Sequence, residues 1–315
     1  MQTKSLLPLV LMSLVACSVG LKVPVKIGAA ANLSAPSTAQ IMNGTFSGVF
    51  EHPFTFSNGF YQGAPFTAQG ASRPEVRLWE ELIVFGDLDG RPGDEAALLM
   101  SATSGGTGEQ IYVAAVGTKD DKLEELGTLL VGDRTKVRSL RIADRNIVMD
   151  VVESGPQEPA CCPTQLAEKK YVVQDGHLQH ASSTGTGRLS LAILAGTDWT
   201  LVELDGQPVA AALKAPTLSF RDGQVAGFSG CNRFFGGVKE SSPGRIAVGP
   251  LAGTRMACPK EPMALEDRYL ARLSAVAGYT FLAGKLALVT SQEAGSSSLK
   301  FARQAPGSQG AAPVR

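Results

Sequence analysis

The sequence predicts a mainly β protein of two domains, and the second domain adds one helix and is therefore of the α+β type. The chain has 315 residues, a length typical of about two domains. Glycine (35 residues) and proline (18) are frequent while aromatic residues make up 6%, a balance that suits short strands joined by tight turns. Turn signals such as Asn43-Gly44, Asn58-Gly59 and Asp175-Gly176 recur between short apolar runs, as in all-β domains.

The charge distribution excludes one class of partner. The formal net charge is zero and the hydrophobic content is 44%, which indicates a globular chain rather than a charged tail. Lysine and arginine are scattered and form no basic stripe interleaved with aromatic residues. We therefore expect no nucleic-acid partner.

The first 17 residues have the pattern of an export signal. Lys4 supplies a positive charge, and residues 6–16 form an apolar run that is too short for a bilayer, which needs about 20 residues. The run ends in Leu14-Val15-Ala16-Cys17, which resembles a lipobox. The resemblance implies cleavage before Cys17 and acylation of Cys17 as the anchor, and Ser18 implies the periplasmic face of the outer membrane. The alternative is an ordinary secretory signal with a cysteine near its end.

The first domain is expected to be rich in β-structure. Residues 18–40 show no sustained period and predict a tether, and residues 41–180 then carry the domain. Residues 119–127 are charged and predict a short helix or a loop. Runs such as Gly132-Asp133-Arg134 make this domain similar to uncharacterised bacterial envelope proteins, a resemblance that implies no activity. Strands are expected at residues 76–85, 96–100, 111–116, 147–152 and 171–173.

A linker is expected between the two domains. Residues 181–196 contain the run Ser182-Ser183-Thr184-Gly185-Thr186-Gly187, which is typical of a loop. The second domain is then expected over residues 197–303, followed by a disordered tail at 304–315. Its strands are expected at residues 199–204, 217–220, 224–228, 245–248, 279–282, 285–289 and 299–302.

One helix is expected in the second domain. It begins near Pro262, a position that proline tolerates, and ends at Gly278. Leu265, Tyr269 and Leu273 recur at helical spacing and share one face. Because the helix is alone among strands, that face must be buried against the sheet.

Two cysteine-containing runs connect the second domain to a known family. One is Gly227-Phe228-Ser229-Gly230-Cys231-Asn232-Arg233-Phe234-Phe235-Gly236-Gly237, and the other is Thr254-Arg255-Met256-Ala257-Cys258-Pro259. Together they resemble the signature of the META domain, the fold of the HslJ-type envelope lipoproteins. The resemblance implies a curved, partly open β-barrel-like sheet with one packed helix. It also implies an association with heat-shock and antibiotic-tolerance responses.

The cysteines beyond Cys17 would reach an oxidising compartment after export, and the four of them allow three pairings. The resemblance favours Cys231 with Cys258, because both lie in the META signature, and two buried thiols are the alternative. The bond would close a loop of roughly 28 residues and stabilise the fold by about 3–4 kcal/mol. Cys161 and Cys162 would then form a vicinal disulfide or remain thiols.

A candidate calcium site lies in Phe85-Gly86-Asp87-Leu88-Asp89-Gly90-Arg91-Pro92-Gly93-Asp94-Glu95-Ala96. The run resembles an FG-GAP-type loop, which would place ligands at Asp87, Asp89, residue 91 and Glu95. Calcium prefers several oxygen ligands from a tight, glycine-containing loop, but residue 91 is an arginine. The alternative is a strand–turn–strand corner whose acids cap backbone amides.

The histidines and the adjacent cysteines form no recognisable metal or redox motif. His52, His177 and His180 lie near turns without an evident serine or aspartate partner, so we expect surface histidines. A zinc site that joins the last two to Cys161 and Cys162 fits poorly, since cysteine ligands are usually separated by two to four residues. A redox motif needs a two-residue gap between its cysteines, which is absent here.

Nucleophile motifs are also incomplete. The run around Ser229 has Cys231 where a hydrolase elbow needs glycine, and Ser297-Ser298-Leu299-Lys300 matches Ser-x-x-Lys without its partner motifs. Phosphate loops and dinucleotide fingerprints are absent from the sequence. Asn232 and Arg233 are expected to satisfy backbone groups at the glycine-rich bend, with a functional role as the alternative. We therefore expect no catalytic residue, and calcium is the one candidate cofactor.

These observations predict a non-enzymatic, lipid-anchored envelope protein, which is a binding or stress-tolerance factor of the outer membrane. Its partners would be the membrane, through the anchor, and a hydrophobic peptide, an acyl chain or an envelope protein held in an apolar groove of the barrel. One alternative is a periplasmic thiol oxidoreductase that uses Cys161 and Cys162, or a hydrolase. Another is a structural role in which the first domain only spaces the second from the membrane.

Overall fold

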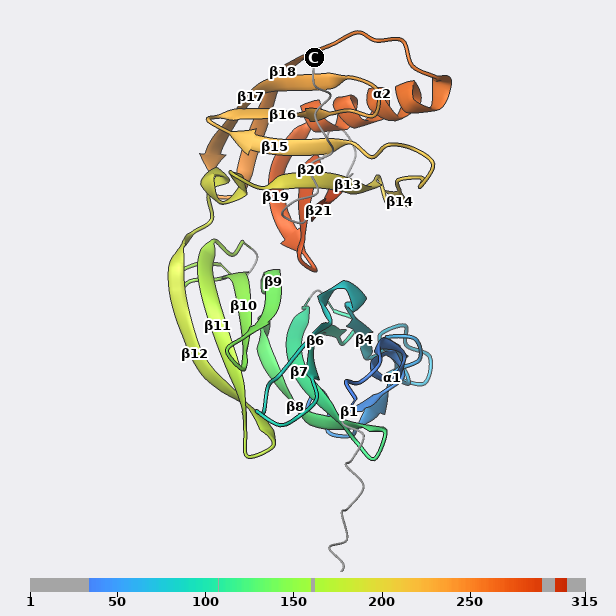
Figure 1. The fold of residues 1–315 in the computed structure, drawn as a ribbon, viewed down its shortest axis with the longest axis vertical. Coiled ribbons are helices and arrows are strands. Elements are labelled where there is room, and N and C mark those ends of the chain that lie inside the picture. Colours follow the sequence, from blue (N-terminus) through green and yellow to red (C-terminus); the bar gives the residue numbers. More distant parts are fainter. Residues whose placement is uncertain (1–33, 107, 160–161, 291–297, 305–315) are drawn as a thin grey trace, which may run out of the picture. The chain divides into compact units, whose positions relative to one another are not determined.

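The computed structural model describes residues 34–106, 108–159, 162–290 and 298–304 (Figure 1). Strands dominate, and two α-helices occur among the described residues, so the expectation of a mainly β protein is confirmed. Backbone contacts group residues 33–315 into one compact unit. The signal and lipobox with Cys17, most of the tether, Cys161 and nearly all of the tail lie outside the described residues.

A six-stranded antiparallel sheet forms around two strands that are buried on both faces. Its order is β3-β4-β6-β7-β8, with β5 beside β6. One face of β6 and β7 packs on helix α1 (Thr38–Met42) and on phenylalanines around β1 (Thr45–Phe46) and β2 (Phe54–Thr55). Because the other face is covered as well, both strands have nearly continuous apolar sequences. The strands are β3 (Phe60–Gln62), β4 (Glu75–Leu78), β5 (Val84–Gly86), β6 (Glu95–Thr103), β7 (Gln110–Lys119) and β8 (Lys122–Asp133).

A four-stranded antiparallel sheet covers that other face. It consists of β9 (Lys136–Ala143), β10 (Asn146–Glu153), β11 (Gln165–Gln174) and β12 (His177–Arg188), side by side in chain order. Asp144 (φ 51°) and Arg145 (φ 59°) make the two-residue turn from β9 to β10. Such hairpins require a left-handed backbone conformation, with positive φ, at the turn residues. Ile147, Met149 and Val151 of β10 point into the core shared with β6 and β7.

Three expectations for this part of the chain are wrong. Residues 119–127 form no helix, because Asp120 and Asp121 (φ 51° and 58°) close a tight β7–β8 hairpin. Residues 76–85 are two strands separated by a 3₁₀ turn, η1 (Glu80–Leu82). Residues 181–188 belong to β12 rather than to a linker, since β11 pairs with them despite their serine and glycine content.

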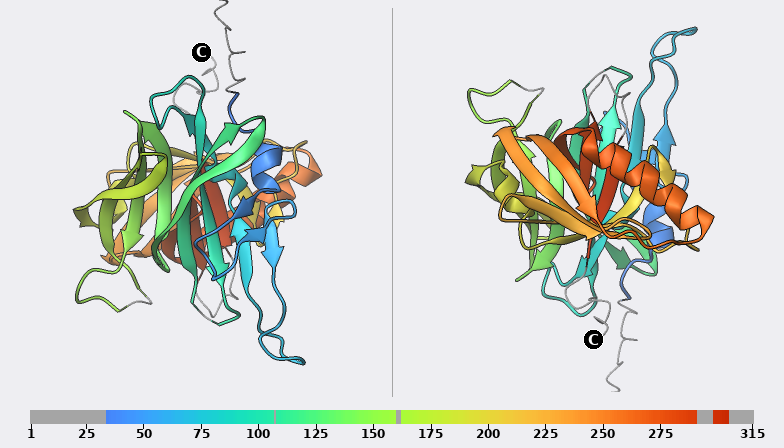
Figure 2. Two further views of the ribbon diagram at one scale, coloured as in Figure 1. Left: turned by 90° about the horizontal axis from the view of Figure 1, so that it is seen from below. Right: turned by 90° about the horizontal axis from the view of Figure 1, so that it is seen from above.

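The C-terminal sheet has nine strands and is nearly closed, with one seam (Figures 1 and 2). Its order is β18-β17-β16-β15-β13-β21-β20-β19, with β14 beside β13. At the seam between β18 and β19, the Tyr279 N–H donates to the Gly244 carbonyl over 2.9 Å. The strands are β13 (Asp198–Leu204), β14 (Gln207–Pro208), β15 (Thr217–Arg221), β16 (Gln224–Phe228), β17 (Arg233–Ser242), β18 (Arg245–Gly253), β19 (Val276–Leu282), β20 (Lys285–Thr290) and β21 (Ser298–Arg303).

Helix α2 (Lys260–Ser274) packs on this sheet, as expected (Figure 2). Its Leu265, Tyr269 and Leu273 are buried, and the Tyr269 ring lies 5.7 Å from that of Phe234. The helix ends at Ser274 and not at Gly278, which lies in β19. A Cβ at Gly278 would approach the Gly244 carbonyl oxygen to 2.7 Å, so this glycine allows the seam to close.

The barrel-like sheet also contacts the sheets that precede it in the chain. Val152, Leu166 and Leu189 belong to the same buried cluster as the barrel core, which also includes Leu194 of the 3₁₀ turn η2 (Leu191–Leu194). At the β19–β20 turn, the Gly284 N–H donates to the Val137 carbonyl over 3.1 Å, and Lys285 pairs with Glu81. The expected linker is therefore replaced by packed structure.

Candidate functional site

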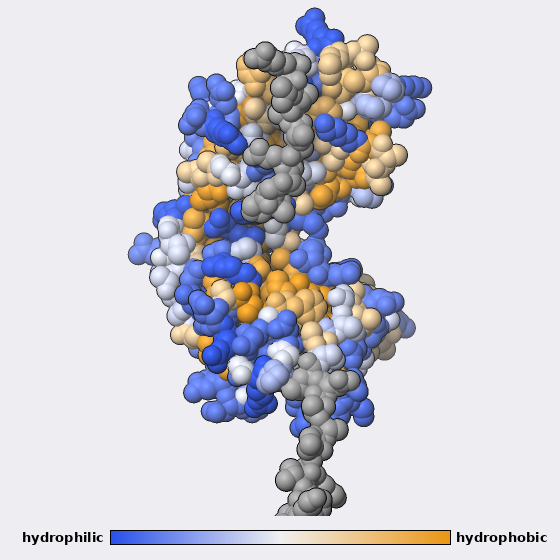
Figure 3. Space-filling model, in the orientation of Figure 1, coloured by the Kyte–Doolittle hydropathy of each residue, from blue (hydrophilic) through white to orange (hydrophobic). Residues whose placement is uncertain are grey.

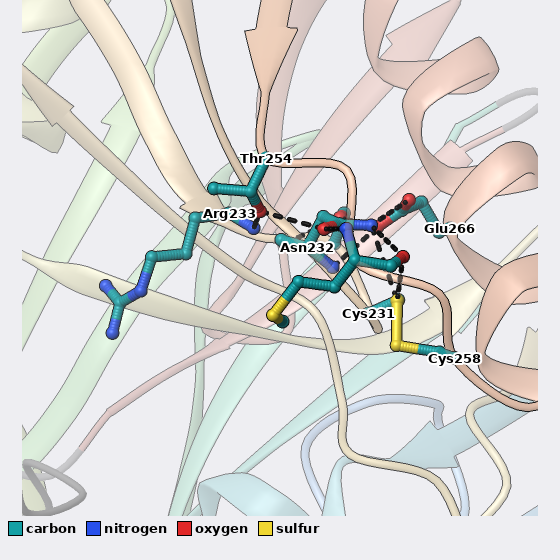
Figure 4. The surroundings of a disulfide bond; sticks show 8 residues. Cys231, Asn232, Arg233, Thr254, Cys258 and Glu266 are labelled. Atoms are coloured by element: carbon teal, nitrogen blue, oxygen red, sulfur yellow. Dashed lines mark hydrogen bonds between the residues drawn. A yellow bond between two sulfur atoms is a disulfide. The ribbon is translucent and has the colours of Figure 1, made fainter. Parts of the chain in front are cut away.

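The glycine-rich turn between β16 and β17 is joined to the segment before α2 by a disulfide (Figure 4). The structure pairs Cys231 with Cys258, with their Cα atoms 6.0 Å apart, as the META resemblance implied. Gly230 precedes the first cysteine with φ +114°, and a Cβ there would lie 3.3 Å from the Pro262 carbonyl oxygen. A side chain would therefore strain the turn and push it away from α2.

A carboxylate of α2 organises the polar groups beside the disulfide. Glu266 accepts hydrogen bonds from the Ser229 hydroxyl, from the Asn232 N–H (2.7 Å) and from the Asn232 side-chain amide (2.9 Å). Burial raises the pKa of Glu266, but these hydrogen bonds outweigh it and leave the pKa below its usual value. The carboxylate is therefore held ionised, and it fastens α2 to the turn.

Asn232 connects this carboxylate to the chain on the other side. Its side-chain oxygen accepts from the Met256 N–H (2.7 Å) and from the Thr254 hydroxyl (2.8 Å), and the residue is 5% exposed. The expectation that Asn232 satisfies backbone groups is confirmed. The same expectation is wrong for the side chain of Arg233, which points away from the network in Figure 4 while its backbone pairs with Thr254.

The chemistry open to this network is limited by burial. The Ser229 side chain is 0% exposed, and its hydroxyl is shared between the Asn232 carbonyl and Glu266. A serine in this state has no access to a substrate. Sequence reasoning missed Glu266, although an acid directly after the buried Leu265 was a signal that one carboxylate lies at the edge of the packed face.

The acidic corner gathers the predicted calcium ligands. One carboxylate oxygen from each of Asp87, Asp89 and Glu95 lies within 4.8 Å of the others. Asp87 also accepts the Gly90 N–H (2.6 Å), Asp89 accepts the Arg91 N–H (2.8 Å), and Glu95 accepts the Leu88 N–H (2.8 Å). The acids therefore cap backbone amides, as in the alternative interpretation, and at the same time form a cluster that oxygen-seeking cations would fit.

The charges around this corner are incompletely balanced. Arg91 lies 3.5 Å from Asp89, and Arg145 lies 3.9 Å from Asp87. Glu95 is 8% exposed. Burial first, and then the neighbouring Asp89 and Asp87, raise its pKa despite the backbone hydrogen bonds. A bound cation would remove this electrostatic cost.

The loop that carries the adjacent cysteines is anchored by Glu158. Hydrogen bonds from the Thr164 hydroxyl and from the N–H groups of Gly155 and Thr164 lower the pKa of Glu158 to about 2, and Arg188 adds to the effect. Cys162 is exposed, while Cys161 lies outside the described residues.

The surface histidines are placed as expected. His52, His177 and His180 are exposed, and the His180 ring stacks edge-on against Tyr171 at 5.3 Å. In the part of the chain that the structure describes, the acidic corner is the one group of His, Cys, Asp or Glu residues arranged for a metal ion.

The fold and the disulfide define a class: a nearly closed β-barrel-like domain that one packed helix and a cystine complete. Residues 192–306 match the family model of the META domain, so the C-terminal third of the chain is a META domain. The resemblance inferred from the two cysteine runs is thereby confirmed. Within the described residues, the structure has no helix that combines the length and apolar character needed to cross a membrane.

Two solved structures are similar to part of the chain. An NMR structure of a protein from Burkholderia xenovorans is 27% identical, with a TM-score of 0.30, and covers 36% of this chain and 86% of that one. A second NMR structure is 28% identical, with a TM-score of 0.31, and covers 36% of this chain and 94% of its own. No curated protein matches the chain.

Proposed function

We propose that this protein is a non-enzymatic, lipid-anchored envelope protein, which acts as a binding or stress-tolerance factor at the periplasmic face of the outer membrane. The observation that carries the proposal is the Cys231–Cys258 disulfide inside the META domain. Such bonds persist in oxidising compartments, so the disulfide agrees with the export signal that ends at Cys17.

The use of the polar residues supports a role without catalysis. The polar side chains beside the disulfide form their hydrogen bonds with one another and with the backbone; they belong to Ser229, Asn232 and Glu266. This hydrogen-bond network stabilises the packing of α2 on the turn. It contains no nucleophile that solvent can reach.

The surface of the META domain supports a binding role. Phe235 of β17 is 56% exposed, Met256 is 59% exposed and Met263 of α2 is 41% exposed. Figure 3 shows orange hydrophobic areas among blue hydrophilic ones on the face it displays. Exposed methionine and aromatic side chains are common where proteins bind other molecules, and they suit a hydrophobic peptide, an acyl chain or another envelope protein.

Metabolic labelling with an alkyne analogue of palmitate tests the anchor. We expect the wild-type protein to take up the label and to fractionate with the outer membrane, and Cys17→Ser to do neither. Ser18→Asp should move the labelled protein to the inner membrane, while the matched Ser18→Ala should not. A wild-type protein that takes up no label would contradict the lipid anchor. If the protein is labelled, crosslinking in intact envelopes would identify its partner.

The exposed position of Cys162 keeps a thiol oxidoreductase as the second candidate function. Alkylation with and without reductant separates the two. Cysteines that stay oxidised and do not catalyse insulin reduction support the proposed role. Thiols that cycle, with activity lost in Cys161→Ser and Cys162→Ser, would support the enzyme instead.

A further inference from the structure

A pocket beside the seam of the META barrel has a lining that the roles described above do not use. It is bounded by residues of β9, β10 and β19, by the loop after Cys162 and by the turn between β17 and β18, and its volume is 180 Å³. Both the barrel and the four-stranded sheet contribute to its walls. Ligand pockets are often found where two such layers meet.

The charged residues in the lining are all cations. Lys136 and Arg245 line the pocket, and its lining contains no aspartate or glutamate. Lys136 is only loosely paired, with its Nζ 3.8 Å from Glu109. Glu240 touches the lining residue Tyr279, but its oxygens accept from the Tyr279 hydroxyl (3.3 Å) and the Leu191 N–H (2.7 Å), and it does not line the pocket. The pocket therefore has an excess of positive charge.

Part of the remaining wall is apolar and firmly packed. Val152, Leu189 and Phe281 line it and are at most 6% exposed, so they belong to the core and not to a mobile surface. Gly244 forms part of the rim with φ +75°, and a Cβ there would lie 3.3 Å from Leu189. The shape of the pocket is thus set by core packing on one side and by a tight turn on the other.

We propose that this pocket binds a small organic anion, a monocarboxylate with a short apolar body. A cavity of about 150 Å³ holds a benzene-sized molecule, so the volume of 180 Å³ suits a body of that size. The carboxylate would lie between Lys136 and Arg245, where charge-assisted hydrogen bonds are strong. The apolar body would contact Leu189 and Phe281. Inorganic phosphate would leave that wall unused and is expected to bind more weakly.

This ligand site goes beyond the proposed function and does not depend on the lipid anchor. The labelling experiment and the binding experiment therefore test the two proposals independently. A protein without an anchor can still bind the anion, and an anchored protein can fail to bind it.

Titration of the purified full-length protein, followed by NMR or calorimetry, tests the proposal with three benzene-sized probes. We expect benzoate to bind at least about tenfold more tightly than neutral benzyl alcohol, and benzamidine not to bind, because only the anion meets the two cations. Amide shifts on benzoate addition should be largest around Lys136 and Arg245.

Variants locate the site. Arg245→Gln and Lys136→Gln should each weaken benzoate binding about tenfold. Arg221→Gln removes an exposed cation of β15 that does not line the pocket, and it should change benzoate binding less than about twofold. Equal binding of benzoate and benzyl alcohol, equal loss in all three variants, or no binding of benzoate would overturn the proposal. If Lys136→Gln fails to fold by circular dichroism, Arg245→Gln decides alone.

Discussion

Two carboxylate sites of this protein differ in the groups that surround the acid. Glu266 in the META domain faces hydrogen-bond donors, and its pKa is lowered. Glu95 in the acidic corner is buried beside Asp87 and Asp89, and burial first, and then these two acids, raise its pKa. Burial penalises the charged form at both sites; the hydrogen-bond donors outweigh that penalty at Glu266, whereas at Glu95 burial prevails and the neighbouring acids add to it. The first site is complete as it stands, whereas the second would gain stability from a cation.

The disulfide beside Glu266 should give the largest effect. Replacing both Cys231 and Cys258 with serine opens the loop that the disulfide closes between two positions 27 residues apart in the sequence. We expect a loss of about 3–4 kcal/mol in the free energy of unfolding, measured by denaturant titration. Replacing Cys161 and Cys162 is the matched control and should cost much less, because adjacent cysteines close almost no loop. Equal losses from both pairs would contradict this view of the META domain.

Glu266→Gln tests the donors around the carboxylate. We expect a loss of about 2 kcal/mol at pH 7, because hydrogen bonds to a charged acceptor weaken. A lowered pKa means that the contribution is present above the unfolded-state value near 4.5 and disappears as the pH falls through the folded-state pKa. Wild type and variant should therefore converge in acid. Glu261→Gln, in the first turn of the same helix, should change stability by less than about 0.5 kcal/mol.

Gly230→Ala tests the turn that brings these donors together. We expect a loss of about 1–2 kcal/mol, because φ +114° is unfavourable for alanine and the new Cβ crowds Pro262. Gly237→Ala is the control, since a Cβ there meets nothing within 4 Å. Thermal unfolding of both variants measures the difference. Equal stability of the two variants would show that the turn is not constrained by α2.

Adding calcium tests the acidic corner, the second of the two carboxylate sites. At five times its dissociation constant, calcium should stabilise the protein by about 1 kcal/mol, seen as a higher Tm. Asp89→Asn should abolish the shift and the neighbouring Asp94→Asn should retain it. Without calcium, the raised pKa of Glu95 means that stability falls as the pH rises from the unfolded-state value through the folded-state pKa. Glu95→Gln should remove that dependence. An unchanged Tm in calcium would end the metal interpretation.

The elements that the sequence predicted well are those with strong local signals. The Asp175-Gly176 turn, the buried face of α2 and the apolar runs of β6 and β7 all appear where expected. The disulfide came from family resemblance and not from spacing. Strand β12 was missed beyond His180 because its serines and glycines have a low strand propensity, which pairing with β11 overrides.

The polar sites were harder to predict, since their chemistry depends on partners far apart in the chain. Glu266 lies 34 residues from Asn232, and its position after Leu265 indicates the edge of the packed face but not which turn the carboxylate contacts. The acidic corner was found because its ligands are close in sequence. The raised pKa of Glu95 was not predicted, because it depends on the burial of this residue at the start of β6.

The shared cluster that contains Leu189 and Leu194 has a practical consequence for studies of the isolated META domain. A fragment cut at residue 197 would remove both side chains from the buried cluster to which Trp199 and Phe220 also belong. A recombinant piece that starts before Leu189 would keep these two leucines, although Val152 and Leu166 would still be missing. Solubility and melting behaviour of the two fragments would therefore differ for reasons unrelated to their biological partner.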